Sequence, residues 1–142
     1  MKIVKMIVVL NVVCVLTLHA HAQQSGKAKS DQAKRDQLRA TAQQICPVTG
    51  NKLDQHGKPV KVKIGQEQVF LCCKSCLKEK IKAQHWATIH ANFAKAQAKC
   101  PVMKKPLPKN PKWTIVEGQI VYVCCPPCIE KIEKEPGKYL KI

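Results

Sequence analysis

The chain has 142 residues and nine cysteines, and 25 Lys and Arg residues against nine acidic ones give it a formal net charge of +16. A chain of this length can hold one ordinary domain or two small ones, and no more. Modules of about 45–50 residues bury too little apolar surface to fold on that basis alone, so disulfides or a metal must support them if the chain is divided.

The first 22 residues have the pattern of a secretory signal peptide. A short basic start precedes an apolar run over 6–18, which is shorter than the about 20 residues of a membrane span, and Ala-His-Ala at 20–22 fits the small-x-small cleavage pattern. We expect cleavage after Ala22 and a secreted or periplasmic protein with no transmembrane segment; an uncleaved anchor is the alternative. Cleavage also removes Cys14, leaving eight cysteines and a net charge of about +14.

Residues 23–44 form a polar, basic linker. Ser30 is a candidate N-cap for a helix running from Asp31 toward Gln44. Leu38 is the only sizeable apolar side chain in this helix, so no face of it requires burial. We interpret the segment as a basic tether that is helical in part.

The rest of the chain contains an internal repeat, with units at 45–83 and 99–142. Each unit opens with Cys-Pro-Val, at Cys46 and Cys100, and has a leucine at the same distance further on. An alternating apolar pattern with a central glycine follows in each, "VKVKIGQEQVFLC" in the first and "WTIVEGQIVYVC" in the second. Two short alternating runs around a glycine predict a β-hairpin in each unit.

A Cys-Cys-x-x-Cys cluster and a helical pattern follow each hairpin. The apolar side of the predicted helix carries Cys73, Cys76, Leu77 and Ile81 in the first unit and Cys125, Cys128, Ile129 and Ile132 in the second. An amphipathic helix over 84–98 then joins the units, with an apolar stripe at Trp86, Ile89 and Phe93 that we expect to pack them together. The fold class predicted is therefore α+β, with a hairpin and a helix in each of two small modules.

Four cysteines in each unit are candidate metal ligands: Cys46, Cys72, Cys73 and Cys76, and Cys100, Cys124, Cys125 and Cys128. Adjacent cysteines pair badly, because neighbouring Cα atoms lie about 3.8 Å apart and disulfides need about 4.4–6.8 Å. Thiols three and four positions apart on a helix face the same way, so with the distant first cysteine they can surround one ion. Zn²⁺ and Cu⁺ both suit thiolate ligands, and the metal's identity stays open.

On these motifs the chain resembles tandem TRASH/YHS domains over about residues 45–142. The shared pattern is Cys46-Pro-Val…Cys72-x-x-x-Cys76, then Cys100-Pro-Val…Cys124-x-x-x-Cys128 and Pro136-x-x-Tyr139. The resemblance implies treble-clef modules that bind heavy metals in sensing or trafficking, with those six cysteines as ligands. Cys73 and Cys125 depart from the family pattern, and Thr49 and Met103 stand where a second turn cysteine would be. The fourth ligand is therefore Cys73 or Cys125, or a position open to exchange.

Two other uses of the cysteines remain open. A small secreted protein with an even cysteine count is the usual context for a disulfide framework. Cys73-Lys-Ser-Cys76 also has the spacing of a thiol oxidoreductase, although the chain lacks the order of strands and helices found in thioredoxin.

The sequence contains no catalytic serine–histidine–carboxylate set and no phosphate-binding glycine loop, so we expect no enzyme. Its lysines are spread along the chain without interleaved aromatic residues, which argues against nucleic acid as a partner. The basic surface suits adhesion to anionic envelope components. We therefore expect an exported metal-binding protein in metal homeostasis, storage or delivery; the alternative is a disulfide-stabilised secreted binding module without metal.

Overall fold

The computed structural model describes Lys27 and residues 29–140, so the predicted signal peptide lies outside the described residues. The chain divides into two compact units after Leu38. Residues 29–38 of the first unit are helical, and Arg39–Ile142 form the second unit, which contains every strand described. Within the described part of the chain, no helix combines the length and the apolar character that crossing a membrane requires.

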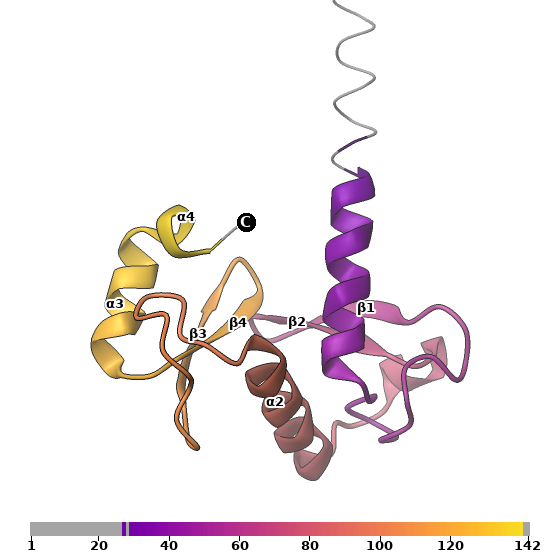
Figure 1. The fold of residues 1–142 in the computed structure, drawn as a ribbon. Coiled ribbons are helices and arrows are strands. Elements are labelled where there is room, and N and C mark those ends of the chain that lie inside the picture. Colours follow the sequence, from indigo (N-terminus) through magenta and orange to yellow (C-terminus); the bar gives the residue numbers. More distant parts are fainter. Residues whose placement is uncertain (1–26, 28, 141–142) are drawn as a thin grey trace, which may run out of the picture. The chain divides into compact units, whose positions relative to one another are not determined.

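The first repeat is built on a β-hairpin with a two-residue turn. Strands β1 (Val60–Ile64) and β2 (Glu67–Leu71) pair antiparallel, with Val60 opposite Leu71 and Ile64 opposite Glu67 (Figure 1). Gly65 opens the connecting turn with a φ of +59°, a conformation in which a side chain would be strained. The alternating apolar residues of β1 point inward and its lysines outward, as the period-two pattern predicts.

The second repeat has the same plan and a longer helix. Strands β3 (Lys112–Val116) and β4 (Gln119–Val123) form the hairpin, and α3 (Pro126–Lys134) and the short α4 (Pro136–Tyr139) follow. Two prolines in the first turn of α3 remove N–H groups that would have no helical partner. The prediction of an α+β fold with two hairpin-and-helix modules is confirmed.

Helix α2 (Ala83–Gln97) joins the repeats and packs against the second hairpin (Figure 1). Ile89 and Phe93 are buried in one cluster with Ile120 and Tyr122 of β4. Strand β2 also meets the turn of the second hairpin, because the N–H of Gln68 donates to the carbonyl of Gly118 at 2.8 Å. The two repeats therefore share a core, as the apolar stripe of α2 predicts.

The helix predicted after the first cysteine cluster was wrong in its extent. Only a 3-10 turn, η1 (Lys74–Lys78), forms there, and Leu77 is exposed. The chain then runs without helix from 79 to 82, where the N–H of Lys82 donates to the carbonyl of Pro47 at 3.1 Å. A continuous helix would lose this bond to the Cys-Pro-Val turn, so a tertiary contact overrides the local periodicity.

The expectation that no face of the linker helix needs burial was also wrong. Residues 39–43 of the second compact unit are helical, and Gln43 is fully buried there. The Gln43 amide donates to the carbonyl of Phe70 at 2.7 Å and accepts from the Phe70 N–H at 2.8 Å. Gln97, at the end of α2, makes the same two bonds to Tyr122 at 2.6 and 2.8 Å.

Replacing Gln43 with alanine is expected to lower the free energy of unfolding by about 2–4 kcal/mol, because two buried backbone groups of Phe70 lose their partner. Urea denaturation followed by circular dichroism measures the change. The matched control is Gln84→Ala, since Gln84 is an exposed glutamine at the start of α2 and should cost less than about 0.5 kcal/mol. Equal effects of the two substitutions would contradict a bracing role for Gln43.

Candidate metal centres

The first cysteine cluster lies where the first hairpin meets η1. The Sγ atoms of Cys46, Cys72 and Cys76 all lie within 4.8 Å of one another, with 3.9 Å from Cys46 to Cys76 and 3.7 Å from Cys72 to Cys76. A tetrahedral Zn²⁺ with Zn–S bonds of about 2.3 Å needs sulfurs about 3.5–4 Å apart. All three side chains are buried, so the cluster is part of the first core.

The second cluster repeats this arrangement at the start of α3. The Sγ atoms of Cys100, Cys124 and Cys128 also lie within 4.8 Å of one another, and Cys124 and Cys128 are 3.9 Å apart. Cys100 and Cys128 are buried in the second core, and Cys124 packs against it. The structure thus brings the first cysteine of each repeat to its strand–helix junction.

The extra cysteines border their clusters. Cys73 Sγ lies 3.9 Å from Cys72 Sγ and 3.6 Å from Cys76 Sγ. In the second repeat, Cys125 Sγ lies 3.8 Å from Cys124 Sγ and 3.2 Å from Cys128 Sγ. All eight of these described cysteines are free thiols. A fourth sulfur therefore lies beside each cluster, at a partly exposed residue, but outside the group of three sulfurs that all lie within 4.8 Å of one another.

The two Cys-Pro-Val turns hold the first cysteine of each repeat by its backbone. Cys46 donates its N–H to Asn51 and accepts from the N–H of Gly50, at 2.8 and 2.9 Å. Cys100 makes the equivalent bonds to Lys105 and Lys104, at 2.9 and 2.8 Å. These tight turns present a sulfur from a segment far away in sequence.

Backbone donors favour the thiolate form of these two cysteines. Burial raises the pKa of each thiol, but hydrogen bonds from N–H groups outweigh burial and lower the pKa to about 7. The donors are Thr49, Cys72 and Val48 for Cys46, and Met103, Cys124 and Val102 for Cys100. Since a thiolate is the form that binds metal, each turn prepares one ligand near neutral pH.

The other thiols of the two clusters have pKa values above that of a free cysteine. Burial raises the pKa of Cys72 and Cys76 in the first cluster, and that of Cys124 and Cys128 in the second. A bound cation would reverse this preference, because metal binding to a thiol displaces its proton. Each cluster of sulfurs thus fits a soft metal ion, and the positive charge of that ion would stabilise the thiolates.

Sequence reasoning missed the two glutamines that brace the sites. Gln43 and Gln97 bind the residues two positions before the cysteine pairs, and so fix the strands that lead directly into Cys72 and Cys124. The signal was present, because Ala-Gln-x-x-Cys-Pro-Val occurs at 42–48 and again at 96–102. The repeat therefore begins inside each preceding helix.

Comparison with known proteins adds no relative. No family model, no curated protein and no solved structure matches the chain. The two clusters of three cysteines hint at metal-binding modules, and they are positioned to bind a metal ion.

Proposed function

We propose that this chain is an exported protein that binds soft metal ions at two thiolate centres and serves metal homeostasis, storage or delivery. The observation that carries the proposal is the convergence of three cysteine sulfurs from distant segments, made twice with the same local geometry. Convergence at metal-ligand spacing is hard to obtain by packing alone, because buried thiols need no such common centre.

The ligands in this proposal are the six converging cysteines, with Cys73 and Cys125 as the fourth ligand of each centre. Zn²⁺ and Cu⁺ are the candidate ions, since both bind thiolates and the two differ mainly in coordination number and redox behaviour. The treble-clef, TRASH/YHS-like character of the modules belongs to the proposal and is supported by the turn, hairpin and helix order around each cluster.

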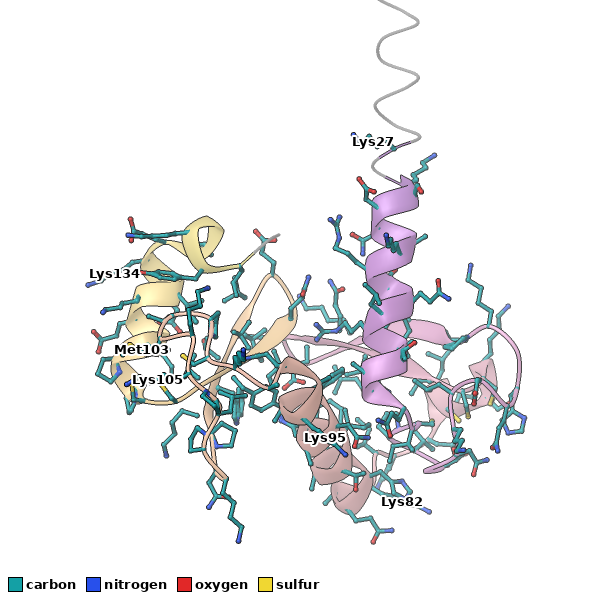
Figure 2. The ribbon with its side chains drawn as sticks, viewed as in Figure 1. Lys27, Lys82, Lys95, Met103, Lys105 and Lys134 are labelled. Carbon is teal, nitrogen blue, oxygen red and sulfur yellow. The ribbon has the colours of Figure 1, made fainter. Side chains whose placement is uncertain are left out.

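The proposed role is binding and not catalysis. Three of the sulfurs in the first cluster are buried in its core, which leaves little room for a substrate beside the ion. Export is supported by the signal-like pattern of the first 22 residues. The basic surface, whose lysines include Lys82, Lys95 and Lys134 in Figure 2, suits contact with anionic envelope components.

Purification from the native compartment under anaerobic conditions tests the proposal. We expect about two equivalents of metal per chain by elemental analysis, and few thiols reactive with a disulfide reagent until a chelator is added. Protein without metal whose cysteines are oxidised in pairs would contradict the proposal and favour the disulfide-stabilised module.

A further inference from the structure

The protein covers its two candidate metal centres to different extents. In the first repeat Cys72 is 1% exposed, whereas its counterpart Cys124 is only half-buried. The turn residues Pro47 and Val48 are buried, whereas the equivalent Pro and Val at 101–102 are partly exposed. The first centre therefore has one partly exposed cysteine, Cys73, and the second has two, Cys124 and Cys125.

A threonine shields the first centre at the position where the second has a methionine. The hydroxyl of Thr49 lies 3.6 Å from Cys72 Sγ and can donate to it. Met103 occupies the same place in the second turn and is 45% exposed; Figure 2 shows it at the surface beside α3. A hydrogen bond to a ligand sulfur stabilises the thiolate and occupies a direction of attack on it.

Helix α2 also clamps the first turn. The N–H of Lys82 donates to the carbonyl of Pro47, and the His85 ring packs so closely on Gly50 that an added Cβ would lie 2.7 Å from its Nε2 atom. The second turn has Lys104 in place of that glycine, at a φ of +58° and exposed. With a side chain at this position, no ring can pack on the turn as closely as His85 packs on Gly50.

We propose that the first centre retains its ion while the second exchanges its ion with thiol ligands of a partner. The inference rests on the proposed function and assigns different roles to its two sites. In the exchange, an incoming thiolate bonds to the ion as a protein Cys–metal bond breaks. The released cysteine takes up a proton, and the ion keeps its oxidation state. Attack requires an accessible ligand shell, which Cys124 and Cys125 provide.

Site-resolved release of zinc tests this proposal. The protein is purified as its host produces it, loaded with Zn²⁺, and mixed with excess glutathione and a chelator. Cysteines are then alkylated in short pulses. Peptide mapping then reports alkylation at 72–76 and at 124–128 separately, with a chelator-free sample as the background. We expect the second cluster to become reactive about tenfold sooner, the equivalent of one hydrogen bond of about 1.4 kcal/mol.

A substitution at Thr49 separates the effect of its hydroxyl from the other differences between the two centres. Thr49→Met should speed release from the first centre about threefold to tenfold and leave the second unchanged. Thr49→Ser is the matched control, because it keeps the hydroxyl that contacts Cys72 and should release at the rate of the original protein. If Thr49→Met releases zinc from the first centre at an unchanged rate, Thr49 does not shield that centre.

The outcomes separate this inference from the function beneath it. If both clusters become reactive at the same rate, or the first sooner, the division of roles is overturned while metal binding stands. If the protein takes up neither Zn²⁺ nor Cu⁺ and alkylation is unaffected by either metal, the proposed function fails, and the inference fails with it.

Discussion

Replacing Cys72 or Cys124 with serine is expected to abolish metal binding at that centre and to unfold the repeat that contains it. Each residue directly follows a hairpin strand and places its sulfur within 4.8 Å of two other cysteine sulfurs. Since modules this small depend on the ion for stability, loss of binding is loss of folding free energy, which in zinc-binding peptides amounts to about 10–16 kcal/mol. Metal titration under reducing conditions, with circular dichroism, measures both effects.

The neighbouring cysteines provide the matched controls. Cys73→Ser and Cys125→Ser should weaken metal affinity modestly and leave the fold intact, because these partly exposed residues border the clusters and pack against the edges of the cores. Equal losses from both members of a pair would mean that four cysteines close each site with equal weight. Full affinity in all four variants would refute the metal centres and leave the disulfide framework.

Removal of residues 99–142 is expected to destabilise the first repeat even with metal bound. Ile89 and Phe93 of α2 would lose their contacts with Ile120 and Tyr122. Burying side chains of this size contributes about 1.5–3 kcal/mol each, so the melting temperature should fall by about 10 °C or more. Thermal denaturation of the metal-loaded truncated and complete chains measures the difference.

A point substitution separates this shared core from the other effects of truncation. Phe93→Ala in the complete chain should cost about 3–5 kcal/mol, because it empties a buried site. Leu77→Ala is the control, since Leu77 is exposed on η1 and should change stability by less than about 0.5 kcal/mol. If the truncated chain melts at the temperature of the complete one, the repeats are independent modules.

Residues close in sequence made much of the fold predictable. Each hairpin follows from period-two alternation and a turn that needs a left-handed residue, as at Gly65 and Gly118. The apolar spacing in α2 predicts the buried stripe that includes Ile89 and Phe93. The duplicated cysteine spacing likewise indicates the residues of each centre, because thiols three and four positions apart lie on one side of a helical turn and can share an ion.

The sequence by itself therefore determined the two repeats, their hairpins and the cysteines that form each cluster. Only the tertiary structure decided that Gln43 is buried, that η1 stops short, and that the Thr49 hydroxyl lies 3.6 Å from Cys72 Sγ while Met103 is 45% exposed. The physical reason is the separation in sequence between the residues that make contact. Periodicity reports contacts within one element, whereas a buried amide or a shielding hydroxyl acquires its role from a partner about 20–30 positions away, which the periodicity of one element does not report.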